Sequence, residues 1–107
     1  MSTGKYILEG HLPKLVDDIV EWGRWFEDIT HRRVALTKVG KLSVSTVFLG
    51  LDHNFSEDGE PILFETMIFG SSNEYQERYH TWDEAEVGHK QAVKIAELWN
   101  KKEKEEN

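Results

Sequence analysis

The sequence contains no cysteine and no long apolar run, and each absence excludes a class of structure or chemistry. Without cysteine the chain cannot form a disulfide, a thiolate metal site or a cysteine nucleophile. No segment approaches the roughly 18 consecutive apolar residues that a membrane-spanning helix needs. The first residues also lack the apolar stretch of a secretory signal, so we expect a soluble protein that stays in the cytoplasm where it is made.

Positive charge is scarce as well. Lys and Arg number 13 against 20 Asp and Glu, which gives a formal net charge of −7. General nucleic-acid binding requires clustered basic residues that neutralise phosphates, so we do not expect it here, whereas a basic protein partner is compatible with this charge. The sequence also has no phosphate-binding glycine loop, dinucleotide fingerprint or nucleophile elbow, which makes an enzyme less expected than a binding protein.

The residues that are present predict one folded domain. A length of 107 residues is typical of a single domain, and 38% hydrophobic with 31% charged residues is typical of a globular protein. Four Trp, five Phe and three Tyr supply the bulky side chains of a core. We therefore expect a single domain over 1–107, with a frayed tail at 103–107 where both signs of charge mix.

The hydrophobic pattern predicts an α+β fold, in which an antiparallel meander of about four strands and a short N-terminal strand pack against two helices. Apolar residues three and four positions apart predict the first helix over 15–29, with an ion pair between Arg24 and Asp28. Gly23 inside this helix suggests a close approach to another element. Alternating and β-branched runs predict strands at 5–8, 33–39, 42–51, 61–70 and 75–80.

Two local patterns predict the place of particular elements in this fold. Thr81 and Glu84 form a capping box that predicts the start of the second helix, which we expect to run to about Lys102. The run 42–51 is apolar on both faces, which is typical of a central strand. The expected core stripe of the second helix consists of Trp82, Ala85, His89, Ala92, Ala96 and Trp99.

His89 and Glu65 are polar residues at otherwise apolar positions, and each has two interpretations. A buried His89 needs partners for both ring nitrogens, which a strand carbonyl or Glu65 would supply; alternatively it faces a pocket between helix and sheet. Glu65 requires a partner such as Arg33, Arg78 or His89, or else it accepts hydrogen bonds from a ligand.

Asp52 and His53 begin a polar loop after a strand. Asp52 is expected to form an ordinary Asx-turn, or the two residues orient a general base. If Asp52 and His53 converge with His89 and Glu65, the result is a small hydrolase of the phosphodiester type, which is our alternative hypothesis. We expect no cofactor and no metal site, because no pair of histidines has the spacing of a helical zinc site.

Arginine beside aromatic residues predicts a different kind of site. A guanidinium binds phosphate or carboxylate in bidentate fashion, so Arg33 and Arg78, with Tyr79 and Trp82, are our candidate ligand-binding residues for a nucleotide. These residues would have to converge on one pocket, which suggests a subunit interface in a homo-oligomer. The alternative for the arginines is a solvated or salt-bridged surface.

Four stretches, at 5–11, 44–53, 61–70 and 79–89, together resemble a widespread family of small proteins of tailed bacteriophages and prophages, most of them without an assigned activity. The resemblance covers most of residues 4–96 and keeps the order of the four stretches. It implies a small accessory protein of the host cytoplasm that binds and blocks a host protein or a nucleotide signal of host defence. It implies no functional residues.

Overall fold

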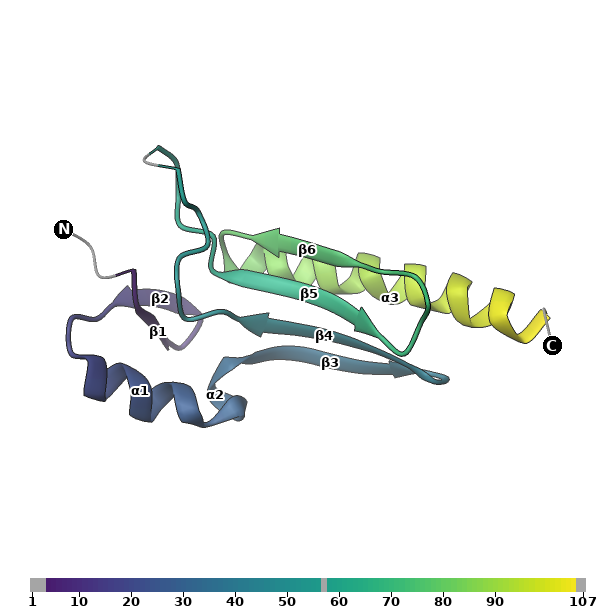
Figure 1. Cartoon of the computed structure of the whole chain (residues 1–107), viewed down its shortest axis with the longest axis horizontal. Helices are drawn as coiled ribbons and strands as arrows, with labels where there is room; N and C mark the ends of the chain where they lie inside the picture. The colour runs from purple at the N-terminus through teal and green to yellow at the C-terminus, as the bar shows by residue number, and fades with distance from the viewer. Residues whose placement is uncertain (1–3, 57, 106–107) are drawn as a thin grey trace.

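The computed structural model describes residues 4–56 and 58–105 and confirms the predicted α+β architecture (Figure 1). Its helices are α1 (Ile19–Glu27), α2 (Ile29–Arg32) and α3 (Trp82–Glu105). Its strands are β1 (Tyr6–Glu9), β2 (Leu12–Leu15), β3 (Arg33–Val39), β4 (Leu42–Phe48), β5 (Phe64–Phe69) and β6 (Gln76–Tyr79). None of the described helices is both long enough and apolar enough to cross a membrane.

The main sheet is an antiparallel meander in the order β3-β4-β5-β6, with α3 along one face (Figure 1). As predicted, β4 is central, and Gly40 adopts the positive φ of 59° required by the tight turn that precedes it. Burial alternates strictly along β4, so Leu42, Val44 and Phe48 face α3 while Val47 faces away. This alternation separates a covered face of the sheet from an uncovered one.

The covered face holds two apolar clusters with a polar layer between them. Thr46 on β4, Thr66 on β5 and His89 on α3 are buried, and Thr46 is hydrogen-bonded to both of the others. On one side of this layer are Leu42, Val44, Ile68, Ala92 and Ala96, and on the other are Phe48, Leu63, Phe64 and Ala85. The small alanines in these clusters allow α3 to approach the sheet closely.

The capping box at the start of α3 is present. The Thr81 hydroxyl accepts a hydrogen bond from Glu84 N at 3.1 Å, and Glu84 Oε1 accepts from Thr81 N at 3.1 Å and from His80 N at 3.0 Å. The helix continues to Glu105, three residues beyond the predicted end, so residues 103–105 of the expected tail are helical; 106–107 lie outside the described residues.

The N-terminal segment differs from the prediction. Leu15, where we predicted the first helix to begin, is instead the last residue of β2, which pairs antiparallel with β1 through Tyr6 and Leu15. Gly10 adopts a φ of 60° in the turn between the strands, which lets the chain fold back at once. Helix α1 begins later, at Ile19, because the Asp18 carboxylate caps its first turn by accepting from Val20 N at 2.9 Å.

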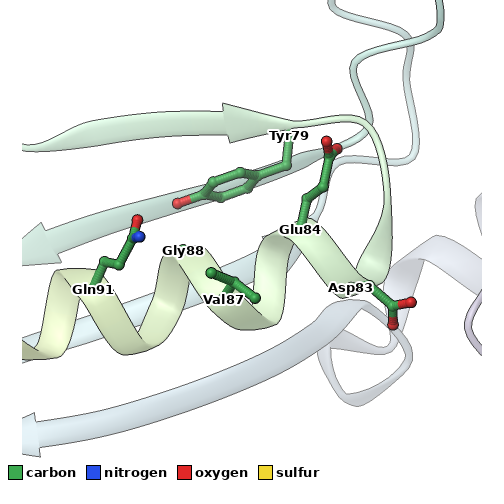
Figure 2. A pocket seen from close by; sticks show the side chains of 6 residues that line it. All are labelled: Tyr79, Asp83, Glu84, Val87, Gly88 and Gln91. Atoms are coloured by element: carbon green, nitrogen blue, oxygen red, sulfur yellow. The ribbon is translucent and has the colours of Figure 1, made fainter.

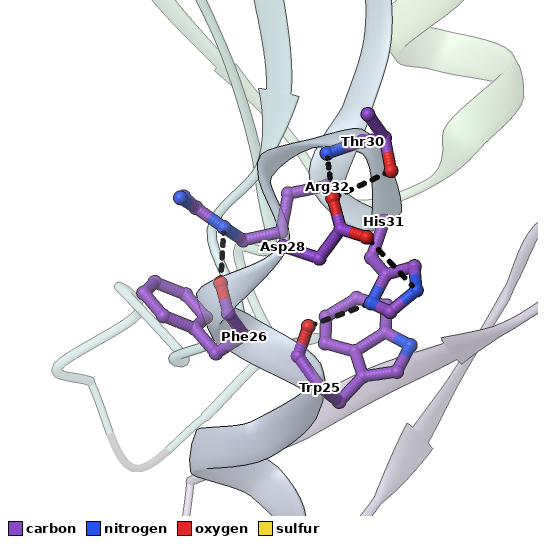
Figure 3. A network of polar contacts seen from close by, with 6 residues as sticks. All are labelled: Trp25, Phe26, Asp28, Thr30, His31 and Arg32. Carbon is purple, nitrogen blue, oxygen red and sulfur yellow. Dashed lines mark hydrogen bonds and ion pairs between the residues drawn. The ribbon is translucent and has the colours of Figure 1, made fainter.

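The predicted single helix over 15–29 is also interrupted at Asp28, which ends α1 and caps α2 (Figure 3). Asp28 Oδ1 accepts hydrogen bonds from Thr30 N at 2.9 Å and Thr30 Oγ1 at 2.6 Å, and these bonds lower the pKa of Asp28. The predicted ion pair with Arg24 is not formed. The Asp28 carboxylate instead lies 3.7 Å from His31 Nε2.

Helix α1 packs beside the β1-β2 hairpin and not along the sheet, so α3 is the helix that covers it. The Trp22 indole N–H donates to the Gly50 carbonyl at 3.0 Å, and Trp25 packs edge-on against Phe48. The predicted close approach at Gly23 is wrong, since no atom lies within 4 Å of the position of an added Cβ.

Candidate functional site

The uncovered face of the sheet gathers three of the residues that the sequence singles out. In the strand register, Arg33 on β3 lies opposite Val47 on β4, Val47 opposite Glu65 on β5, and Glu65 opposite Arg78 on β6. Paired residues of antiparallel strands point to the same face, so these four residues form one row across the sheet. We call this the arginine row.

Within the arginine row, the Glu65 carboxylate accepts hydrogen bonds from two neighbouring side chains. Its Oε2 accepts a hydrogen bond from Arg78 Nε at 2.9 Å and another from Gln76 Nε2 at 2.6 Å. The Glu65 side chain is 12% exposed and that of Arg78 is 39% exposed. Arg78 therefore uses one edge of its guanidinium on Glu65, and among the described residues its two terminal nitrogens form no ion pair or hydrogen bond.

The rest of the uncovered face is mainly apolar and basic. The next row consists of Leu36, Ser45, Met67 and Gln76, and the one after it of Lys38, Ser43 and Phe69. Leu36 and Phe69 are about half exposed, at 44% and 50%. The face thus combines exposed apolar area with three basic side chains (Arg33, Lys38 and Arg78) and one acidic side chain, Glu65.

Tyr79 and Trp82 do not join the arginine row, because both lie on the α3 side of the sheet. The Tyr79 ring lies over Gly88 and extends along α3 toward Gln91, beside a shallow hollow of about 370 Å³ (Figure 2). Trp82 stacks on His11 with ring centroids 3.8 Å apart. The four candidate ligand-binding residues therefore do not converge on one pocket.

His89 lies in the polar layer of the covered face, and both of its ring nitrogens are hydrogen-bonded. Nε2 is 2.8 Å from Thr37 Oγ1 and Nδ1 is 2.7 Å from Thr46 Oγ1, which is itself 2.5 Å from Thr66 Oγ1. The sequence predicts a buried, partnered histidine correctly, but the partners are threonines. Glu65 cannot reach His89 because the two side chains lie on opposite faces of the sheet.

Tyr79 adds an unsatisfied group next to this layer. Within the described part of the chain, its hydroxyl is the one buried side-chain oxygen without a hydrogen-bond partner. Burial raises the pKa of Tyr79, and the nearby Thr66 hydroxyl, which is outside hydrogen-bond geometry, opposes that rise. We assign this group to packing between β6 and α3, where Gly88 leaves room for the ring.

Because the polar layer contains His89, we expect the free energy of unfolding to depend on pH. Burial lowers the pKa of His89, so the folded state keeps the ring neutral where the unfolded chain, with a pKa of about 6.5, takes up a proton. The free energy of unfolding is therefore expected to decrease as the pH falls below about 6.5. His89→Gln, whose amide can bond the same threonines, should weaken this dependence in urea unfolding measured between about pH 5 and pH 8. If the free energy of unfolding depended on pH equally in both proteins, the assignment of this dependence to His89 would be contradicted.

Asp52 and His53 lie in the loop between β4 and β5, where they perform separate turn functions. Asp52 Oδ1 accepts from Asn54 N at 2.7 Å and from Ile62 N at 3.0 Å, which confirms the expected Asx-turn. His53 Nδ1 donates to the Leu51 carbonyl at 2.8 Å. With Glu65 on one face of the sheet and His89 under the other, the four residues of the hydrolase hypothesis are not gathered at one place.

The part of the chain that the structure describes contains no group of three or more His, Asp or Glu side chains placed to hold a metal ion.

The position of Glu65, Arg33 and Arg78 on one face could not be read from the sequence, since it depends on strand register. The sequence does indicate that Glu65 faces away from the core, because it alternates with Phe64 and Thr66, which face inward.

Comparison with known proteins found no family model that matches the chain and no curated protein or solved structure that is similar to it. The resemblance to phage proteins remains an expectation, and the functional argument rests on the geometry of the uncovered face.

Proposed function

We propose that this protein is a non-enzymatic binding protein, which holds an anionic partner against the uncovered face of its sheet. The observation that carries the proposal is the arginine row, in which Arg33 and Arg78 flank Val47 and the already partnered Glu65. The Arg78 guanidinium offsets the negative charge of Glu65 through their hydrogen bond, and the second arginine, Arg33, leaves the arginine row with a net positive charge.

Charge supports an anionic partner. The whole chain has a formal net charge of −7, yet the uncovered face carries three basic side chains and one acidic side chain. An anion is repelled by most of such a surface and attracted to this part of it, so the charge distribution favours one orientation of binding.

The dimensions of the arginine row suit a partner with two anionic groups. Arg33 and Arg78 are three strand spacings apart, or about 14 Å between backbones, and long side chains shorten that distance. Between and beside them lie Val47, Met67 and Leu36, which offer an apolar bed for a flat group such as a base. The nucleotide signal of the phage analogy fits this description, as does an acidic segment of a host protein.

The sequence resemblance supplies the biological context of the proposal. A small accessory protein in the cytoplasm of a host cell would act by sequestering its partner, which requires binding without turnover. A second copy laid on the same face would enclose a small ligand, so a homo-oligomer is part of the proposal when the partner is a nucleotide.

The test is native mass spectrometry and calorimetric titration with a panel of cyclic and linear dinucleotides. We expect Arg33→Gln and Arg78→Gln each to weaken binding about tenfold or more, because each removes a charge-assisted hydrogen bond. Arg78→Lys keeps the charge and loses the planar fork, so its binding should be intermediate. Arg24→Gln on α1, an exposed arginine away from the sheet, is the matched control and should bind like the unaltered protein.

Each result has a definite meaning. Binding that is insensitive to Arg33 and Arg78 would contradict the proposal. If no dinucleotide binds, the same variants are tested for retention of an acidic protein from host extract, and unchanged retention would also contradict it. A nucleotide that appears as a hydrolysed product in the spectra would instead support the hydrolase hypothesis.

A further inference from the structure

The described parts of the loop between β4 and β5, residues 49–56 and 58–63, project beyond the end of the sheet (Figure 1), and the side chains of Asp52 and Asn54 form hydrogen bonds to their backbone. Asp52 bonds the backbone N–H groups of Asn54 and Ile62, which closes the base of the loop. The Asn54 side chain spans its interior, where it donates to the Glu60 carbonyl at 2.9 Å and accepts from Ser56 N at 3.0 Å. A loop held in this way loses little conformational entropy when it binds.

This loop presents a phenylalanine to solvent. Phe55 is 89% exposed, whereas Phe48 and Phe64 in the core are completely buried. Its one ring neighbour in the described part of the chain is His53, at 6.2 Å between centroids. Apart from His53, no described ring packs against Phe55, although Asp52 and Asn54 support the loop that carries it.

The surroundings of Phe55 are acidic. Asp58 and Glu60 are exposed, and neither side chain forms an ion pair or hydrogen bond within the described residues. A surface that accepts this tip must therefore combine an apolar pocket with basic groups at its edge. An apolar pocket edged by carboxylates would be repelled.

We infer that Phe55, Asp58 and Glu60, on the loop between β4 and β5, form a second contact region, in which Phe55 is the anchor that enters an apolar pocket edged by Lys or Arg on a protein partner. An exposed aromatic on a preorganised support is the type of residue that dominates protein interfaces. The inference goes beyond the proposed function, because it concerns other residues and a partner of the opposite charge. Either can fail without the other.

The first step of the test is to identify the partner. Replacing Phe55 with a photoreactive benzoylphenylalanine, and illuminating the full chain in extract of the cells that naturally produce it, should crosslink one protein. Leu98 on α3 is 61% exposed and serves as the matched control position, where the same replacement should not crosslink that protein.

The second step is titration of the purified partner. Phe55→Ala is expected to weaken binding at least about 30-fold, as for a hot-spot aromatic, whereas Leu98→Ala changes it by less than about twofold. Asp58→Asn combined with Glu60→Gln should slow association and reduce its dependence on salt. Unchanged thermal unfolding of the Phe55→Ala variant, expected for a residue this exposed, shows that the loss is not caused by misfolding.

Three results would overturn the inference. They are the absence of a crosslink from position 55, a crosslink from position 55 only to a second copy of the chain, and a purified partner whose affinity Phe55→Ala leaves within about twofold.

Discussion

Phe64→Ala is expected to reduce the free energy of unfolding by about 3–5 kcal/mol, which is the usual effect of truncating a buried phenylalanine. The ring is completely buried and contacts Phe48 at 5.3 Å and Trp82 at 6.3 Å between centroids. Removing it leaves a cavity in one of the two apolar clusters and separates α3 from the sheet. For a domain of this size that loss is a large part of the total stability.

Phe69 is the matched control, because it lies on the same strand and faces the other way. It is 50% exposed on the uncovered face, so we expect Phe69→Ala to cost about 1 kcal/mol or less. Urea unfolding followed by tryptophan fluorescence measures both variants. If Phe69→Ala reduced the free energy of unfolding as much as Phe64→Ala does, the assignment of an uncovered face would be contradicted. If that loss also increased with protein concentration, a second copy would be covering the sheet.

Gly88→Ala is expected to destabilise the protein by about 1–3 kcal/mol, although alanine is the better helix former. An added Cβ would overlap the ring and hydroxyl of the half-buried Tyr79. The ring is held between β6 and α3 and cannot move aside without opening that contact (Figure 2). Overpacking at this position therefore outweighs the gain in helix propensity.

The other helical glycine gives the opposite expectation. Gly23 lies in α1 with no atom within 4 Å of an added Cβ, so Gly23→Ala should stabilise the protein by about 1 kcal/mol. In a Tyr79→Ala background, Gly88→Ala should also become favourable, because the overlapping ring is gone. Thermal unfolding of the single and double variants tests both statements. Destabilisation by Gly88→Ala that persists without the Tyr79 ring would contradict this explanation.

The two apolar clusters and the polar layer between them bear on function as well as stability. Thr46, Thr66 and His89 satisfy one another, so the covered face uses its polar groups internally. The uncovered face retains polar groups that nothing within the described fold uses, above all Arg33 and the outer edge of the Arg78 guanidinium. Binding is therefore expected on the uncovered side, where the fold leaves both charge and apolar area open.

The fold class and several local features followed from the sequence alone. The capping box at Thr81 and Glu84, the short connection between the strands predicted at 33–39 and 42–51, and the central position of β4 follow from patterns of residues close together in the chain. The predicted start of the first helix is wrong because Leu15 fits the end of a strand as well as the start of a helix, and the pairing of β2 with β1 decided between them.

The candidate site could be predicted only in part. The sequence singled out Glu65 and His89 as polar residues at apolar positions, which need partners, and Arg33 and Arg78 as guanidinium groups that can bind an anion. Tertiary structure alone decided that His89 bonds threonines under α3 while Glu65 joins the arginines on the opposite face. The physical reason is register: a shift of one residue would turn each strand's side chains to the other face, and register is set by contacts between segments far apart in the chain.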